Sequence, residues 1–224
     1  MKIGIIGSGK IGATLGRIWA ETGHEIYFSS RHPSQLTHLV QEIQVRGHCA
    51  QAGTVKEAVR YGDVILFSPP YWETDHALEL MGPDKESLDG KVVMDATNPF
   101  TPDGVELALP LGTTASSELV KKIPRARLVK AFNTLYWQTL QDTHHEPFEN
   151  RYVICYVGNE ESSKEIVCKL IEDAGFVSFD LGPLQNAVLM EPGGPFFNQE
   201  YTLYQAETVL RLVKREERER NKAA

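Results

Sequence analysis

The sequence predicts an α/β fold in which a doubly wound parallel sheet is extended by a C-terminal strand–helix–strand unit and a final helix. Two observations favour this class. Short, continuous apolar runs alternate with segments of helical periodicity along most of the 224 residues. These runs lack the polar alternation of half-exposed strands, so helices are expected to cover both faces of the sheet. The length suits one large domain, or one domain with a small appendage.

The first half of the chain is expected to contain four strands, at residues 2–7, 25–29, near 49–51 and 63–68. A helix over residues 9–23 ends at Gly23, and a proline opens a helix over residues 33–43. Thr54 and Glu57 have the spacing of a capping box, which starts another short helix. A further helix is predicted over residues 71–81.

The second half is expected to add strands at residues 91–97, 127–132, 152–157 and 176–180. Residues 162–165, Ser-Ser-Lys-Glu, are predicted to cap a helix that ends near Gly175. The last helix is placed at about 199–214, where an apolar stripe favours packing on the core; dimerisation through the same stripe is the alternative.

Composition and charge exclude several classes of protein. The formal net charge of −7 argues against a nucleic-acid partner, because phosphate backbones are bound by basic surfaces. No run approaches about 18 consecutive apolar residues, so no membrane-spanning helix is expected. Three cysteines without a CxxC pair favour a reducing compartment, and Lys10 and Arg17 interrupt the apolar run that a signal peptide would need. A cytoplasmic location is therefore expected.

Residues 7–12, Gly-Ser-Gly-Lys-Ile-Gly, match the G-x-G-x-x-G motif of dinucleotide-binding proteins. The motif follows a predicted strand and opens a predicted helix, which is the context it requires. Gly7 permits a tight turn, Gly9 lets the backbone approach a pyrophosphate, and Gly12 lets the helix pack close to the sheet. We therefore expect a Rossmann-type site whose pyrophosphate is held by Gly7, Ser8, Gly9, Lys10, Ile11 and Gly12. A tight turn without a ligand is the alternative.

The second predicted strand ends in Ser29, Ser30 and Arg31, where many dinucleotide sites carry a carboxylate that binds an unmodified ribose. A carboxylate would repel a 2′-phosphate, whereas a guanidinium pairs with it and a serine hydroxyl donates a hydrogen bond to it. These three residues are therefore expected to select NADP(H) over NAD(H). The alternative is that Arg31 is only a solvated loop residue.

Polar residues and prolines follow the later strands, at the edge where an open α/β sheet binds its ligand. Ser68 and Pro69 follow the fourth strand, Asn98 the fifth and Asn133 the sixth. The two amides suit a nicotinamide carboxamide or a substrate carbonyl, with a turn-forming role as the alternative. Asn133 is the candidate positioning residue, and no catalytic acid or nucleophile is assigned. That absence favours hydride transfer between two redox cofactors, which needs positioning rather than a side-chain acid.

No metal site is predicted. His76 lies in a helical pattern, and His144 and His145 lie in a polar loop, without a further ligand at metal-binding spacing. We expect these histidines to lie at the surface.

The segments quoted above, with KVVMDATNP at 91–99, RLVKAFNT at 127–134 and DLGPL at 180–184, resemble the coenzyme F420-dependent NADP oxidoreductases and the related reductase domain of the six-transmembrane metalloreductases. The resemblance covers about residues 1–190. It implies that Ser30 and Arg31 hold the 2′-phosphate and that Ser68 and Pro69 pass the riboses. It also implies that the second redox partner, coenzyme F420 or a flavin, lies near Asn133 and residues 184–195.

The expected activity is therefore hydride transfer between NADP(H) and a flavin- or deazaflavin-like acceptor. Two alternatives stay open: NADPH-dependent reduction of a small imine or carbonyl compound, and a non-catalytic NADP(H) sensor that acts through a protein partner. Residues 1–141 are assigned to the NADP-binding domain. Residues 151–224 are assigned to an extension that completes the sheet and the acceptor pocket within one compact unit, and a homodimer is a further expectation.

Overall fold

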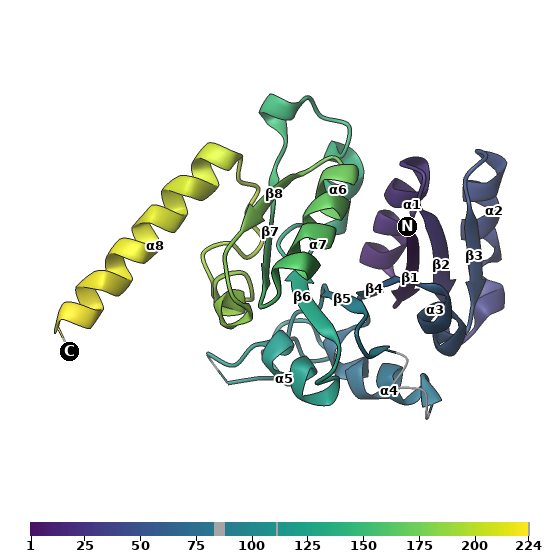
Figure 1. The fold of residues 1–224 in the computed structure, drawn as a ribbon, viewed down its shortest axis with the longest axis horizontal. Coiled ribbons are helices and arrows are strands. Elements are labelled where there is room, and N and C mark those ends of the chain that lie inside the picture. The colour runs from purple at the N-terminus through teal and green to yellow at the C-terminus, as the bar shows by residue number, and fades with distance from the viewer. Residues whose placement is uncertain (83–87, 111, 224) are drawn as a thin grey trace.

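The computed structural model describes residues 1–82, 88–110 and 112–223. Its centre is one eight-stranded sheet of order β3-β2-β1-β4-β5-β6-β7-β8, with helices on both faces (Figure 1). The strands are β1 (Lys2–Ile6), β2 (Glu25–Ser29), β3 (Ala50–Gly53), β4 (Val64–Phe67), β5 (Val92–Asp95), β6 (Arg127–Ala131), β7 (Val153–Gly158) and β8 (Val177–Asp180). The order β3-β2-β1-β4-β5 is that of a doubly wound nucleotide-binding fold, so the predicted fold class is confirmed.

The helices are α1 (Lys10–Glu21), α2 (Thr37–Val45), α3 (Val55–Tyr61), α4 (Thr74–Glu79), α5 (Ala115–Lys122), α6 (Trp137–Thr143), α7 (Glu161–Asp173) and α8 (Leu203–Ala223). Short 3-10 turns, Pro33–Leu36 and Tyr71–Glu73, precede α2 and α4 and account for the beginnings of those two predicted helices. The capping box of Thr54 and Glu57 is present at the start of α3, as predicted.

Two helices were not predicted, and one was predicted to start too late. Helix α5 follows a capping box in which Thr114 and Ser117 exchange hydrogen bonds, and α6 is only seven residues long. Helix α7 begins at Glu161 rather than at the serines, because the Glu160 carbonyl already accepts the backbone N–H groups of Ser163 and Lys164. The serine hydroxyls instead donate to the Glu160 carboxylate.

Alternate residues of each central strand enter opposite cores, which confirms that both sheet faces are covered. On β4, Val64 and Leu66 pack toward α1, α2 and α7, while Ile65 and Phe67 pack toward α3, α4 and α5. Trp19 of α1 is fully buried in the first core, and its ring meets Phe132 edge to face with 5.4 Å between centroids.

The sheet is parallel except at one place: β7 runs antiparallel to β6, and β8 is parallel to β7. Both strands belong to the same sheet as β1–β6, so the polar segment 142–151 does not interrupt it. The division into a 1–141 NADP-binding domain and a 151–224 extension within one compact unit stays a prediction.

Helix α8 extends away from the rest of the molecule (Figure 1). Only its first turns contact the core: Ala206 is buried, and Val209 and Leu210 are half-buried against the second core. Tyr204 and Leu212 are exposed, so the core interpretation of the apolar stripe holds for the N-terminal turns alone. The homodimer stays a prediction. Among the described residues, no helix has the length and apolar character that crossing a membrane requires.

Candidate functional site

The loop between β1 and α1 is shaped by the glycines of the predicted motif. Gly7 has φ +92°, and a Cβ there would lie 2.5 Å from the backbone nitrogen of Pro69. A Cβ at Gly12 would lie 2.3 Å from the Gly7 carbonyl oxygen. Gly9 differs, because a Cβ there would meet nothing within 4 Å. Gly7 and Gly12 are thus needed by the fold, whereas Gly9 leaves open space in front of the α1 N-terminus, where a pyrophosphate fits.

Side-chain hydrogen bonds hold this loop against the neighbouring strands. The Ser8 hydroxyl donates to the Ser29 carbonyl at 2.9 Å and accepts from the Ser29 N–H at 3.1 Å. The Ser68 hydroxyl donates to the Gly7 carbonyl at 2.9 Å. Lys10 points elsewhere, with its ammonium 5.3 Å from the Trp137 ring centre. Ser8 and Ser68 therefore fix the loop, and any contact of theirs with a dinucleotide would come from the backbone.

A pocket of about 510 Å³ opens beside the loop, at the carboxyl ends of β1, β2 and β4. We call it the loop pocket. Its lining includes Gly7–Gly9, Ser29–Arg31, Pro69, Trp72, Glu73 and His76. The structure thus brings the predicted pyrophosphate loop, the predicted phosphate-selecting residues and Pro69 around one cavity.

The three phosphate-selecting residues are not equivalent in the structure. Ser29 is buried and its hydroxyl donates to the Ile5 carbonyl at 2.8 Å, inside the sheet. Ser30 accepts the His32 N–H on its hydroxyl oxygen, so its own proton is available for a ligand. Arg31 is exposed at the pocket rim. The role predicted for Ser29 or Ser30 therefore suits Ser30.

Sequence reasoning missed Glu73, which lies on the 3-10 turn before α4. Its Oε2 is 3.5 Å from Arg31 Nη1 and 3.2 Å from His76 Nδ1. Because a carboxylate repels a phosphate, the ion pair between Arg31 and Glu73 must break before Arg31 can bind a 2′-phosphate. No spacing rule links the end of β2 to residues 42 positions later, so this contact emerges only from the fold.

A second cavity, of about 290 Å³, lies at the carboxyl ends of β5 and β6 and is called the aromatic pocket. Its lining is Ile11, Ala96, Asn98, Phe100, Gly104, Phe132, Asn133, Leu135, Tyr136, Trp137, Phe197 and Asn198. No Asp, Glu, Lys, Arg or His is among these described residues, and five of them are aromatic. Residues 184–195, expected here, contribute none of the lining; Phe197 and Asn198, just after them, do.

Asn133 is among the residues that line the aromatic pocket, and one atom of its side chain is unpaired. Its Nδ2 donates to Asn98 Oδ1 at 2.9 Å and to the Met190 carbonyl at 2.6 Å. Asn98 Nδ2 donates back to the Asn133 carbonyl at 3.2 Å. The Asn133 side chain is buried and its Oδ1 has no hydrogen-bond partner. This acceptor suits an amide N–H of a ligand, because a buried unpaired oxygen is costly.

The backbone around Asn133 is also unusual. Phe132 has φ +62° and Asn198 has φ +51°, and among the described residues they are the non-glycine residues with positive φ. Both line the aromatic pocket. A bulky residue in this region costs on the order of 1–3 kcal/mol and persists where packing enforces it, often at a functional site. Burial of the Phe132 ring against Trp19 supplies that enforcement.

A buried ion network supports the pocket from below. Lys130 Nζ lies 3.1 Å from Asp95 Oδ2, 2.8 Å from Glu191 Oε1 and 2.8 Å from the Thr97 carbonyl. Burial alone would lower the pKa of Lys130, but the two carboxylates outweigh it and raise that pKa. Glu191 also accepts the backbone N–H of Ala115 at the start of α5.

The network joins the ends of β5 and β6 to the segment that contains Met190, whose carbonyl binds Asn133. Its three ionic members are fully or almost fully buried and line neither pocket. Lys130 is therefore a positioning residue, and no lysine is among the described residues that line the aromatic pocket. The signal in the sequence was a lysine inside an apolar strand, RLVKAF, which needs a buried partner.

Residues 2–99 match a protein family described as NADP oxidoreductase coenzyme F420-dependent. The metalloreductase STEAP3 of Rattus norvegicus is 25% identical over 186 residues, which are 83% of this chain and 35% of that protein. This chain thus spans about a third of the length of that relative.

Two solved structures share the fold over most of both chains. A proposed F420-dependent NADP reductase from Arthrobacter sp. FB24 superposes with TM-score 0.72 and 22% identity, covering 84% of this chain and 87% of the other. The hypothetical protein SMa0349 from Sinorhizobium meliloti gives TM-score 0.75 and 25% identity, covering 90% and 94%. Together with the family match, they confirm the resemblance predicted from the sequence.

Proposed function

We propose that this chain, an NADP-dependent oxidoreductase by family resemblance and fold, transfers hydride between NADP(H) and a planar, flavin- or deazaflavin-like acceptor in the aromatic pocket. The observation that carries the proposal is the make-up of that pocket. Its lining residues include five aromatic side chains and no charged one, and also Asn133, whose buried Oδ1 is unpaired. When bound, NADPH supplies the hydride.

The loop pocket supports the choice of NADP(H). The open space at Gly9 fits a pyrophosphate, while Ser30 and Arg31 offer a hydroxyl donor and a guanidinium at the rim. The lining of the loop pocket reaches Pro69 and that of the aromatic pocket reaches Ile11, on either side of the glycine loop. A dinucleotide extended past the loop would thus have its adenosine end at Arg31 and its nicotinamide end toward Asn133.

The aromatic pocket supports a planar acceptor. Phe100 and Phe197 have ring centres 6.1 Å apart and, with Trp137, offer flat apolar faces. A carboxamide or conjugated ring system that reached Asn133 Oδ1 with an N–H would satisfy this buried, unpaired acceptor, and the hydrogen bond to Asn98 fixes the orientation of the amide. Positioning of two flat rings is sufficient for hydride transfer, because no proton has to be supplied at the same instant.

Reduction of a small imine or carbonyl compound is the second candidate, and Tyr136 is the observation in its favour. The Tyr136 hydroxyl lines the same pocket and accepts the Asn198 Nδ2–H at 3.1 Å, so it keeps its own proton for donation. Among the described residues that line this pocket, Tyr136 is the one whose side chain carries a hydroxyl group. This reaction would depend on Tyr136, whereas transfer to a flavin would not.

The test compares acceptors and one variant. NADPH and NADH are titrated calorimetrically, and NADPH oxidation is then followed with FMN, riboflavin, a deazaflavin and a cyclic imine. Turnover with a flavin or deazaflavin that Tyr136→Phe leaves unchanged supports the proposal. Turnover with the imine that Tyr136→Phe lowers by about 100-fold or more would favour the second candidate. Tight NADPH binding without any turnover would overturn both and favour a sensor.

A further inference from the structure

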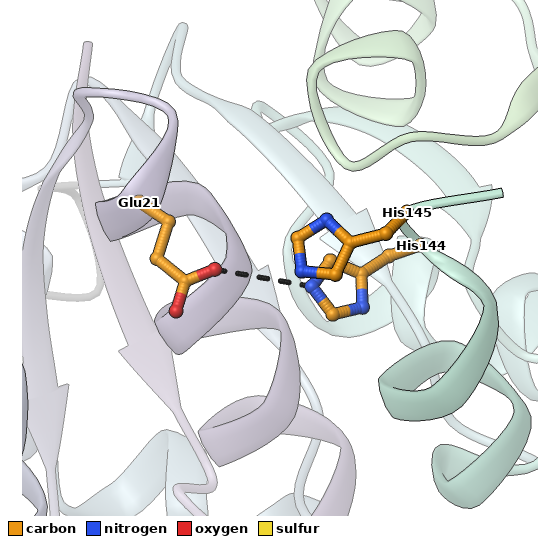
Figure 2. A group of neighbouring side chains, drawn as sticks. All are labelled: Glu21, His144 and His145. Carbon is orange, nitrogen blue, oxygen red and sulfur yellow. Dashed lines mark ion pairs between the residues drawn. The ribbon is translucent and has the colours of Figure 1, made fainter. Parts of the chain in front are cut away.

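A third cavity, of about 510 Å³, lies between α1 and α6, and two histidines meet a glutamate at one end of it. Glu21 is the last residue of α1, and His144 and His145 follow α6 (Figure 2). One ligand atom from each side chain lies within 4.8 Å of the other two, and His144 Nε2 is 3.8 Å from Glu21 Oε2. We propose that these three residues bind a divalent transition-metal ion, with Zn²⁺ as the reference ion.

The identity of the ligands decides the class of ion. Two imidazoles and one carboxylate suit Zn²⁺, Co²⁺, Ni²⁺ or Cu²⁺, whereas Mg²⁺ and Ca²⁺ prefer oxygen ligands alone. A tetrahedral Zn²⁺ with bonds of about 2.0–2.1 Å needs ligand atoms roughly 3.4 Å apart. The ligand atoms now lie within 4.8 Å of one another, and the exposed His145 side chain can move to bring them to the shorter separation. Three protein ligands leave one coordination position for water.

His144 is held in the orientation that a metal ligand needs. Its Nδ1 lies 2.7 Å from the Gln141 carbonyl oxygen, and only an Nδ1–H can make that bond. In the neutral ring the Nε2 lone pair is then free, and Nε2 is the nitrogen that faces Glu21. Metal-bound histidines are commonly fixed in this way, by donation of the other N–H to a backbone carbonyl.

The backbone below the histidines leaves little freedom. Gly175, which follows α7, has φ +85°, and a Cβ there would lie 1.9 Å from the His144 carbonyl oxygen. The histidine loop is therefore packed directly on this glycine. The two imidazole rings also pack together, with 3.6 Å between their centres. Packing thus fixes the His144 backbone, and both rings lie on one side of the cavity before any ion binds.

The charges near the cavity set the expected affinity. The carboxyl-terminal ends of α1 and α6 both point into this region, and helix C-termini favour a cation. Against this, Arg46 Nη1 donates to Glu21 Oε1 at 3.0 Å, and Lys10 and Arg17 also line the cavity. Arg17 is neutralised by Glu42 at 3.0 Å. The competition from Arg46 predicts weaker binding than that of a closed structural site with four protein ligands.

A bound ion would link the two helices that border the pockets. Helix α1 begins at the glycine loop, and α6 begins at Trp137, which lines both this cavity and the aromatic pocket. The ion would join the opposite ends of the same two helices. Its expected effect is to raise the thermal unfolding midpoint of the whole chain, since binding only the folded state stabilises it.

The experiment measures Zn²⁺ binding to the full chain after EDTA treatment and dialysis, by calorimetry and by the visible absorption of bound Co²⁺. The wild type should bind one ion per chain. His145→Ala and Glu21→Gln should each weaken binding at least tenfold and abolish the thermal shift, because each removes a ligand. Arg46→Gln should strengthen binding, because it frees the Glu21 carboxylate.

His76→Ala is the matched control, because His76 also pairs with a glutamate, Glu73, but belongs to no group of three possible metal ligands among the described residues. It should bind Zn²⁺ like the wild type. Absence of saturable binding to the wild type would overturn the proposal, as would unchanged affinity in both ligand variants. Circular dichroism shows that each variant is folded, and neither His145 nor Glu21 is buried, so their replacement should not prevent folding.

Discussion

Replacement of Lys130 by methionine tests the buried network directly. Methionine keeps most of the apolar stem but removes the ammonium that lies 3.1 Å from Asp95 and 2.8 Å from Glu191. Two buried carboxylates would then share a site without a cation. Breaking a buried ion pair by removing one partner costs about 3–5 kcal/mol, because the charge left behind is uncompensated. With a slope near 2.5 kcal/mol/M, the urea midpoint should fall by about 1–2 M.

Two further variants distinguish the effect of uncompensated buried carboxylates from the effect of losing the hydrogen bonds of a lysine. Lys91→Met is the control, since Lys91 Nζ donates to the Val59 and Gly62 carbonyls and the carboxylate that acts on it, that of Asp63, is exposed to solvent rather than buried. Its cost should be about 1–3 kcal/mol. Adding Glu191→Gln should recover part of the loss in Lys130→Met but none in Lys91→Met. A midpoint shift below about 0.5 M for Lys130→Met, or failure of Glu191→Gln to recover stability, would refute the charge argument.

The wild-type network also predicts a pH dependence. The pKa of Lys130 is raised above 10.5 in the folded chain, so the folded state binds its proton more tightly than the unfolded state does. This stability is complete below pH 10.5 and is lost as the pH rises through the folded pKa. Urea unfolding between pH 9 and 12 should show a steeper alkaline loss in the wild type than in Lys130→Met. Equal slopes would count against the shifted pKa.

Three further predictions concern the nucleotide site and the stability of the chain at acidic pH. Arg31→Ala should weaken NADPH binding by more than tenfold, about 2 kcal/mol, and leave NADH binding nearly unchanged in calorimetry; equal losses would remove its phosphate role. Gly9→Ala should weaken the binding of both NADPH and NADH without changing the thermal unfolding midpoint. Gly12→Ala should lower that midpoint, because its Cβ would lie 2.3 Å from the Gly7 carbonyl oxygen, whereas a Cβ at Gly9 meets nothing within 4 Å. Burial, opposed by the hydrogen bond to Asp173, lowers the pKa of His24 below 6.5 in the folded chain. The free energy of unfolding should therefore fall as the pH drops through 6.5 toward the folded pKa, and His24→Gln should make this pH dependence less steep. An equally steep pH dependence in His24→Gln would contradict the shifted pKa.

What could be predicted from the sequence is what neighbouring residues encode. The glycine loop, the strand that precedes it and the helix that follows it are one contiguous signal, and every part of it is present. The apolar strands were found because a strand buried on both faces reads as a continuous run. The antiparallel direction of β7 could not be found in this way, because an apolar run carries no information about which way it enters the sheet.

The parts that were missed depend on residues far apart in the chain. Lys130 reaches Glu191 across 61 positions, which no periodicity connects. His144 and His145 had no third ligand at metal-binding spacing because Glu21 approaches them through space. Ser29 looked like a phosphate ligand by position, but the pleat of β2 turns its hydroxyl into the sheet. In each case tertiary packing, not local propensity, decides the partner.

The three tryptophans lie in three different surroundings, so the intrinsic fluorescence of each can report a different event. Trp19 is fully buried, Trp72 is 46% exposed at the loop pocket, and Trp137 lines the aromatic pocket. Emission from Trp19 should report unfolding, quenching of Trp72 should report the dinucleotide, and energy transfer from Trp137 should report a coloured acceptor. Single Trp→Phe replacements at 72 and 137 would separate the two binding events, and with them the order in which cofactor and acceptor arrive.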